Sequence, residues 1–287
     1  MPGFTGSTID RADNLRLDPE RIAELAADPE ARLLKLAGFD PVLDDEGRLG
    51  WSPVAELAVG AELIFLGLDA GIPLFAPLSP MEQAPAPVWS VFRLLNAMSG
   101  ADAALWGTAR SLIGWHGRHR FCANCGAPTA LFRAGWGRKC GACSAEHYPR
   151  VDPVVIMLAE HRGRVLVGRQ PQYPAGRYSA LAGFVEPGES IEEAVARELK
   201  EEAGIEVRDV RYVASQPWPF PGQLMIACIA EAVDDALTID RTELEDARWM
   251  ERAGVEAALR GDADAPFLAP PHFAIASTLL RHWLSDG

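Results

Sequence analysis

The sequence predicts an α+β protein, in which helical and strand patterns alternate along 287 residues. The first 115 residues combine capped helical patterns with a strand–turn–strand pattern. After Tyr148 the chain changes to β-branched apolar runs, interrupted by one acidic helical segment. An apolar content of 48% with 23% charged residues is ordinary for a globular protein, and the length suits about two average domains.

The N-terminal region carries local structure signals but no recognisable catalytic motif. Asp18-Pro19 and Asp28-Pro29 each place proline after an N-capping side chain, so we expect two short helices there. The runs 63–68 and 72–75 flank a turn and predict a strand–turn–strand. A loop is then expected from five prolines, which are Pro73, Pro77, Pro80, Pro85 and Pro87. Two further patterns predict helices at Val88–Met98 and Ala101–Trp115. We interpret the region as a scaffold or a dimer interface.

The region after Tyr148 begins with a predicted hairpin. Apolar runs at 154–158 and 164–168 are joined by a short turn containing Gly163. Further strands are expected near 210–214 and 224–230, and a C-terminal helix at 273–284.

Charge and hydropathy exclude several classes of protein. With 27 basic and 40 acidic residues the net charge is −13, which disfavours general affinity for nucleic acid or for anionic membranes. No apolar run reaches the ~20 residues of a membrane span, and the N-terminus has no signal-peptide pattern. We therefore expect a cytoplasmic protein without a membrane partner.

Four cysteines form two CxxC pairs, Cys122 with Cys125 and Cys140 with Cys143. Two such turns supply the four thiolates of a tetrahedral Zn²⁺ site, and a complete ligand set makes that metal structural, one ion per chain. Two disulfides are one alternative, which is less favoured in a chain without an export signal. A redox-active pair is the other, and it is less favoured because there are two CxxC motifs rather than one. The basic segment around the cysteines leaves contact with nucleic acid open, although such ribbons more often act as braces.

Residues 183–207 hold eight acidic and two basic side chains. Ser190 and Glu193 form a capping-box pattern at the start of a helix that Gly204 ends. Glu198, Glu201 and Glu202 share one side of this helix, where like charges repel. Such an arrangement suits Mg²⁺ or Mn²⁺, whereas a solvated charged helix face is the alternative. Arg197 is placed to pair with Glu189 or to brace the preceding loop.

This segment resembles the Nudix hydrolase box at every fixed position of that pattern. The matching residues are Gly183, Glu189, Arg197, Glu198, Leu199, Glu201, Glu202, Gly204 and Ile205. The resemblance implies an α/β/α sandwich that holds Mg²⁺ or Mn²⁺ against a diphosphate. It also implies metal ligation by the Ala182 carbonyl, Glu198, Glu202 and Glu243. Glu201 would then be a further catalytic residue that supports the ligands or activates water.

A proline-spaced aromatic run follows at Ser215–Pro221. Alternate prolines stiffen it, so Trp218 and Phe220 could stack on a base at low entropic cost. An SH3-type ligand or a buried aromatic turn is the alternative. After a Nudix box, the run resembles the motif of the NADH pyrophosphatase branch, which also carries a four-cysteine ribbon. The resemblance implies substrate contacts from Arg93, Tyr148, Phe184, Gln216, Pro217, Trp218, Pro219, Phe220, Pro221, Gly222, Gln223 and Ala276.

The resemblance implies hydrolysis of NADH or NAD⁺ to NMN(H) and AMP by a homodimer, with removal of NAD caps from RNA in some members. It gives an N-terminal α+β domain at 1–118, a zinc ribbon at 119–148 and a Nudix domain at 149–287. Gln223 replaces a serine of the motif, and Gly135 stands where some members have an acidic contact. The alternatives are a Nudix hydrolase of another substrate such as ADP-ribose, and a non-catalytic protein that binds NAD or capped RNA.

Overall fold

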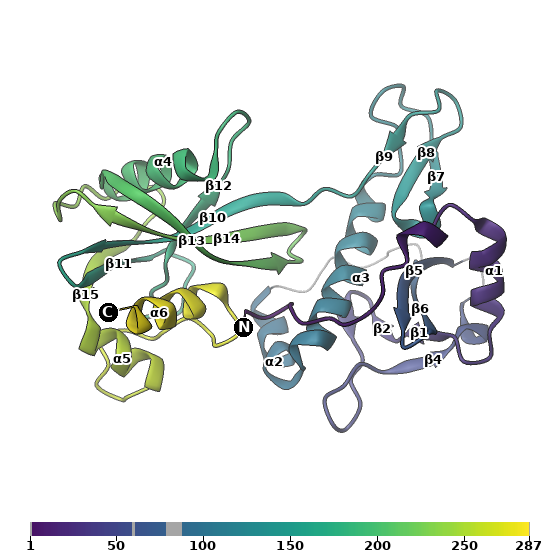
Figure 1. The fold of residues 1–287 in the computed structure, drawn as a ribbon, viewed down its shortest axis with the longest axis horizontal. Helices are drawn as coiled ribbons and strands as arrows, with labels where there is room; N and C mark the ends of the chain where they lie inside the picture. Colours follow the sequence, from purple (N-terminus) through teal and green to yellow (C-terminus); the bar gives the residue numbers. More distant parts are fainter. Residues whose placement is uncertain (1, 59–60, 79–87, 287) are drawn as a thin grey trace. The chain divides into compact units, whose positions relative to one another are not determined.

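A computed structural model describes residues 2–58, 61–78 and 88–286 of the chain (Figure 1). The chain divides into two compact units, which are described separately. One contains residues 152–216 and 223–287 with the N-terminal residues up to Gly3, and the other contains residues 4–151 with 217–222. In the described ranges, no helix combines the length and apolarity needed for a membrane span.

The first unit, which we call the C-terminal unit, is built on a six-stranded mixed sheet. Its strand order is β13-β14-β10-β11-β15, and β12 pairs with β10. Strands β10 and β14 run parallel, whereas β12 pairs antiparallel with β10 and β15 with β11. The elements are β10 (Asp152–His161), β11 (Arg164–Arg169), β12 (Leu181–Phe184), α4 (Ile191–Ala203), β13 (Val207–Trp218), β14 (Gln223–Ala232), β15 (Asp246–Glu251), α5 (Arg252–Arg260) and α6 (Ile275–Ser285).

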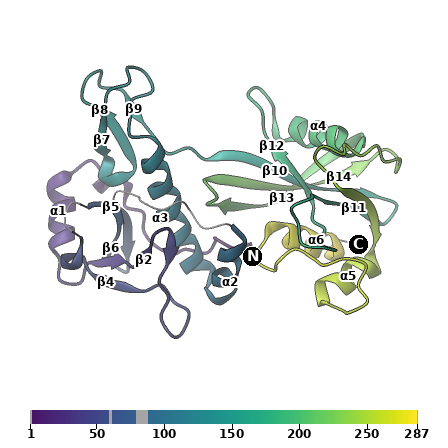
Figure 2. The same ribbon diagram turned by 180° about the vertical axis from the view of Figure 1, so that it is seen from behind.

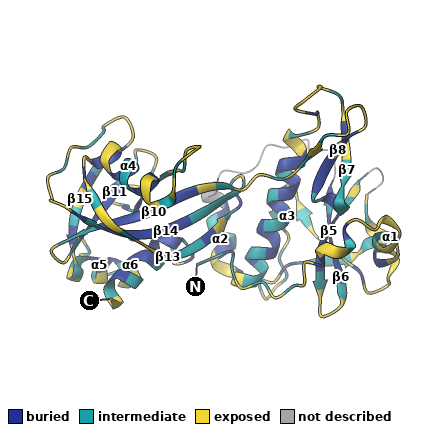
Figure 3. Cartoon of the chain, turned by 45° about the horizontal axis from the view of Figure 1, so that its top comes forward, coloured by how far each residue is buried: buried dark blue, intermediate teal, exposed yellow. Residues whose placement is uncertain are grey.

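Helices cover both faces of this sheet, with α4 on one face and α5 and α6 on the other (Figures 1 and 2). Alternate residues of β10 supply the two cores. Val155 and Met157 pack towards α4, whereas Ile156 and Leu158 pack towards α5 and α6. Strands β10 and β14 are therefore buried along most of their length, as Figure 3 shows. The result is the expected α/β/α sandwich.

The other unit contains a four-stranded sheet of order β4-β1-β6-β5, a β2–β3 ladder and a three-stranded ribbon β7-β8-β9. Helix α3 carries a run of buried residues that includes Trp106, Arg110 and His116. The elements are η1 (Asp13–Leu15), α1 (Pro19–Ala27), β1 (Arg32–Leu34), β2 (Leu36–Ala37), β3 (Asp40–Pro41), β4 (Trp51–Pro53), η2 (Val54–Glu56), β5 (Glu62–Asp69), β6 (Ile72–Leu78), α2 (Val88–Ala97), α3 (Gly100–Arg118), β7 (Thr129–Phe132), η3 (Arg133–Gly135), β8 (Gly137–Cys140) and β9 (Glu146–His147).

Two local predictions in this unit were wrong. The expected helix at Asp28-Pro29 is absent, because Asp28 instead ends α1 and accepts the Glu30 amide in a tight turn before β1. Pro73 and Pro77 lie within β6 rather than in a loop. Strand β6 lies between β1 and β5. Both prolines are paired in register with β5, Pro73 with Leu68 and Pro77 with Leu63, whereas β1 pairs with β6 only at Leu74 and Phe75. Pro80, Pro85 and Pro87 lie outside the described residues.

The remaining element predictions hold, with shifted ends. Helix α2 ends one residue before the predicted Met98, and α3 continues three residues past Trp115. The hairpin of β10 and β11 is confirmed, and α6 begins two residues later than predicted. Helix α5 and strand β15 carried no signal strong enough to be predicted.

Candidate active site and zinc ribbon

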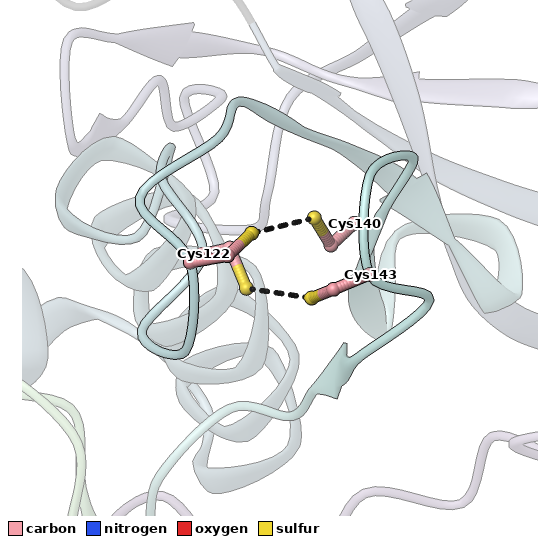
Figure 4. Close-up of side chains that lie close together, drawn as sticks. Cys122, Cys140 and Cys143 are labelled. Carbon is pink, nitrogen blue, oxygen red and sulfur yellow. Dashed lines mark hydrogen bonds between the residues drawn. The ribbon is translucent and has the colours of Figure 1, made fainter.

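The four paired cysteines converge in the ribbon, as the sulfur positions in Figure 4 show. All four Sγ atoms lie within 4.8 Å of one another, with Cys122 3.6 Å from Cys143 and Cys125 3.5 Å from Cys140. These distances are far too long for an S–S bond of about 2.05 Å, so the disulfide alternative is wrong. Four sulfurs in this grouping fit the tetrahedral structural Zn²⁺ that was expected.

Internal contacts hold this ribbon in place within its own unit. The buried Arg138 donates to the Thr129 hydroxyl at 2.7 Å, to the Thr129 carbonyl at 2.6 Å and to His116 Nδ1 at 3.1 Å. Trp136 Nε1 donates to the Phe65 carbonyl at 2.7 Å. Arg138 and Trp136 of the basic segment therefore brace the ribbon through internal hydrogen bonds.

Gly135 explains one departure from the family pattern. Its φ of +90° favours glycine, and a Cβ at this position would lie 2.9 Å from Ile64 Cγ1. No acidic side chain fits there, so this chain does not have the ribbon contact that some members carry.

The Nudix box forms a strand–loop–helix, in which the predicted helix is confirmed and the strand β12 was not predicted. The Ser190 hydroxyl accepts the Glu193 amide at 3.2 Å, and the Glu193 carboxylate accepts the Ser190 amide at 2.7 Å, which confirms the capping box. Gly204 ends α4 in the left-handed region with φ +75°. Local sequence therefore sets where the acidic helix begins and ends.

Arg197 braces the loop before α4. Its guanidinium donates to both oxygens of Glu189, at 2.6 and 2.9 Å, and to the Phe184 carbonyl at 2.9 Å. The same group contacts Glu198 at 2.8 Å and Glu201 at 3.0 Å. Hydrogen bonds from Arg197 hold the pKa of Glu189 down at about 2. Arg197 thus fixes the orientation of three box carboxylates at once.

Glu198 and Glu202 point into the C-terminal unit rather than into solvent. Glu198 is 8% exposed and Glu202 is 3% exposed. Burial, reinforced by the neighbouring Glu198 and Glu243 carboxylates, raises the pKa of Glu202 to about 8. Burial also raises the pKa of Glu198, against the opposing effect of Arg197. Burying two carboxylates side by side costs free energy, and buried side chains are not part of a solvated helix face. That alternative is therefore excluded for these two residues.

Two observations fit this pair to a hard divalent cation. Glu202 Oε2 is buried without a hydrogen-bond partner in the described structure, so one ligand oxygen remains available. Gly183 leaves space for the other carboxylate, because a Cβ there would lie 2.0 Å from Glu198 Oε1. Carboxylate oxygens are the ligands that Mg²⁺ and Mn²⁺ prefer.

The other predicted ligands lie around this pair. Ala182 is half-buried in β12, next to Gly183. Glu201 and Glu243 are exposed, and the Glu243 charge reaches both buried glutamates. The carboxylates are less tightly grouped than the sulfurs, since among the described residues only the four cysteines form a cluster of three or more such ligands within 4.8 Å.

Two neighbours of Glu202 were not predicted. The Asp240 carboxylate also raises the pKa of Glu202, and the Asp240 amide donates to the Glu202 carbonyl at 2.9 Å. Burial raises the pKa of the Tyr173 phenol, and the charge of the nearby Glu202 adds to this effect. Both come from loops distant in sequence, and no local pattern marked them.

The aromatic run divides between the two units after Gln216. Gln216 is fully buried in the C-terminal unit, where its amide donates to the carbonyls of Gly3 and Phe273 at 2.9 and 2.8 Å. Its Oε1 accepts the Ile275 amide at 2.9 Å. The side chain thus links three distant segments.

The remainder of the run packs within the other unit. Trp218 and Phe220 are half-buried, with ring centroids 5.1 Å apart, and both meet the ring of Phe4 edge-on. The Arg110 guanidinium lies 4.7 Å from the Phe220 ring, and its Nε donates to the Pro219 carbonyl. The run therefore resembles a packed aromatic turn that keeps part of each ring accessible.

The other predicted substrate contacts are also distributed over both units. Tyr148, 51% exposed, donates to Glu146 at 2.6 Å, and Arg93 is exposed on α2. Phe184 is 54% exposed at the end of β12, and Gln223 is half-buried at the start of β14. Ala276 is 2% exposed in the first turn of α6, on the side that faces the core, so its side chain offers little surface to a ligand.

Comparison with known proteins identifies two segments of the chain. A model described as "NUDIX domain" matches residues 149–269, and one described as "NADH pyrophosphatase zinc ribbon domain" matches residues 118–148. The chain is 39% identical to the NAD-capped RNA hydrolase NudC of Mycobacterium bovis, across 99% of this chain and 95% of that protein.

The chain is also 37% identical to the human NAD-capped RNA hydrolase NUDT12, across 88% of this chain. It spans about half, 54%, of the length of that relative. Among solved structures, a Nudix hydrolase from Nitrosomonas europaea is similar, with 25% identity, a TM-score of 0.40, and coverage of 46% of this chain and 77% of that one.

Proposed function

The chain belongs to the Nudix hydrolase family, and we propose that it hydrolyses the diphosphate bond of NADH and NAD⁺ to NMN(H) and AMP. The buried pair Glu198 and Glu202, with a ligand oxygen left unpaired, is the observation that carries this proposal. Selection of NAD is supported by the ribbon and by the proline-spaced run 217–221, which accompany the NADH pyrophosphatase pattern.

In the proposed mechanism Glu198, Glu202, Glu243 and the Ala182 carbonyl hold Mg²⁺ or Mn²⁺. When bound, the cation offsets the charge of the diphosphate and acidifies water. Arg197 keeps Glu198 and the loop of Glu189 in position through the contacts described above. Water adds to one phosphorus, the bridging P–O bond breaks, and the other phosphate leaves with the bridging oxygen. Glu201, exposed on the same helix, takes the proton from water or supports the ligands.

The substrate contacts complete the proposal. Phe184 is proposed to stack on a ring of the dinucleotide, and Trp218 and Phe220 to provide an aromatic surface for a base. The remaining contacts are assigned to Arg93, Tyr148, Gln216, Pro217, Pro219, Pro221, Gly222, Gln223 and Ala276. The packing of Trp218 and Phe220 supports a preorganised surface, which costs little entropy when a ligand binds.

Removal of NAD caps from RNA is a further part of the proposal, supported by relatives named NAD-capped RNA hydrolases. We also propose a homodimer, and a cytoplasmic location because the zinc thiolates must stay reduced. The domain division 1–118, 119–148 and 149–287 remains part of the same proposal. Light scattering of the purified protein tests the dimer, since a monomeric mass contradicts it.

A side-by-side assay tests the substrate. The purified protein with Mn²⁺ is given NADH, NAD⁺, ADP-ribose and an NAD-capped oligonucleotide at equal concentration and fixed salt, and the products are separated by chromatography. We expect AMP and NMN(H) in equal amounts from the dinucleotides. Faster cleavage of ADP-ribose than of NADH and NAD⁺ would instead favour another Nudix substrate. Binding of NADH without release of AMP would identify a non-catalytic binding protein.

A further inference from the structure

A cavity of about 290 Å³ lies in the C-terminal unit, where α5 and α6 pack side by side (Figure 1). Its walls come from the end of α5, from the segment 265–272 and from α6, with Arg177 completing it from the loop before β12. None of the box glutamates lines it. The cavity is thus separate from the carboxylate pair and has no role in the function proposed above.

Ser277 gives the cavity a buried polar group without a partner. This residue is 1% exposed, and its Oγ has no hydrogen-bond partner in the described structure. A helical serine ordinarily donates to the carbonyl four residues earlier. Here that carbonyl belongs to Phe273, and it already accepts the Gly3 amide and the Gln216 side chain, both at 2.8 Å. The hydroxyl therefore remains free for a ligand.

Positively charged side chains line the same cavity. Arg281, an exposed residue, lies one helical turn beyond Ser277 on α6, and Arg177 lines the cavity from the loop before β12. Within the described ranges neither arginine has an ion-pair partner, and the buried Arg177 Nε has no hydrogen-bond partner. The third arginine, Arg260, is paired with Asp262 at 2.7 Å. Three arginines against one aspartate leave an excess of two positive charges in a chain whose net charge is −13.

Apart from His272, the rest of the wall is largely apolar and includes Phe267, Leu268 and Pro270. An anion alone would fill only a small part of 290 Å³, so the apolar wall calls for an organic body attached to the anionic group. Guanidinium groups and a serine hydroxyl match the acceptor oxygens of phosphate.

We propose that this cavity is a second ligand site, which binds a small phosphate monoester of about mononucleotide size. The phosphate contacts Ser277 Oγ, Arg177 and Arg281, and the organic body lies against Phe267 and the neighbouring apolar wall. The unpaired hydroxyl and the two arginines without ion pairs are explained together by this one ligand.

Calorimetric titration of the full-length zinc-loaded protein tests the site, with AMP, inorganic phosphate and adenosine as probes. Divalent cation is left out, because the box carboxylates then repel phosphate and binding reports the cavity. The variants are Ser277→Ala and Arg281→Ala. Arg208→Ala is the matched control, since this arginine is exposed on β13, pairs with Glu231 at 2.7 Å and lies outside the cavity.

We expect AMP to bind at one site per chain, and both cavity variants to weaken it about tenfold or more, with Arg208→Ala unchanged. Thermal stability of ligand-free Ser277→Ala should equal or exceed that of the parent, because the substitution removes an unpaired buried hydroxyl. If inorganic phosphate binds as tightly as AMP and its binding is weakened by the same variants, the ligand of the site is free phosphate. The proposed phosphate contacts would then still hold.

Three results would overturn the site. These are no binding of AMP or phosphate at millimolar concentration, equal affinity in all variants, or adenosine binding as tightly as AMP. Arg281→Ala could also cleave capped RNA more slowly without any loss of AMP affinity. That result would mean that Arg281 contacts a polynucleotide, and it would also contradict the proposal. Glu202→Gln should bind AMP with the affinity of the parent protein, because Glu202 does not line the cavity. The binding test of the cavity is therefore independent of whether the proposed hydrolysis is correct.

Discussion

Gly183→Ala is expected to disable the active site while leaving the fold in place. A Cβ at this position would lie 1.9 Å from Glu198 Cδ and 2.0 Å from its Oε1. An ordinary contact is 3.4 Å or longer, so the carboxylate must move by about 1.4 Å. Glu198 has a flexible side chain that can swing away, which makes the structural cost small.

The functional cost is large, because a misplacement of about 1 Å in a reacting constellation can reduce the rate about 100-fold. That factor corresponds to about 2.7 kcal/mol of transition-state stabilisation. We therefore expect kcat for NADH to fall about 100-fold, Mn²⁺ affinity measured by electron paramagnetic resonance to weaken, and the melting temperature to change little.

A double-mutant cycle isolates the cause. If the new methyl group acts through the carboxylate, Gly183→Ala should have little further effect on Mn²⁺ affinity in a Glu198→Ala background. Full activity of the single variant, or an equal loss of affinity in both backgrounds, would refute the role assigned to this glycine.

Three further predictions concern stability. Burial lowers the pKa of His116 from 6.5 to about 4, so the unfolded chain binds more protons than the folded chain between these pH values. The free energy of unfolding should therefore fall by up to about 3 kcal/mol as the pH drops from 6.5 to 4. In urea titrations, His116→Gln should flatten this pH dependence. Gln216→Leu removes three buried hydrogen bonds and should cost about 3 kcal/mol in the same assay, whereas a loss below 1 kcal/mol would contradict their importance. Cys143→Ser should lower the zinc content below one ion per chain and melt the ribbon earlier, so full zinc retention would argue against four-sulfur ligation.

Local sequence was sufficient for the elements whose ends are set by local chemistry. Helix α4 was predicted with its cap and its stop because Ser190, Glu193 and Gly204 act on backbone groups within one turn. The same reasoning failed at Asp28-Pro29. The capping chemistry was present there, but Leu33 and Leu34 follow within a few residues and are buried in β1, so strand pairing determined the structure.

The candidate site was predictable in part for the same reason. The spacing of Glu198 and Glu202 indicated a shared helix face, and both are buried together. The sequence did not indicate that Gln216 would be buried in contact with Gly3 and Phe273, because those segments are 213 and 57 residues away. The environment of Ser277 depends on the same long-range contacts, and so it was also out of reach of local patterns.

The most direct test of the central claim compares the parent protein with Glu202→Gln in the cleavage of NADH with Mn²⁺, with products resolved by chromatography. The account predicts equal amounts of AMP and NMNH from the parent, and a rate lower by several orders of magnitude in a variant with the same melting temperature. Undiminished cleavage by the folded variant would contradict the claim that the buried glutamates hold the cation at the diphosphate.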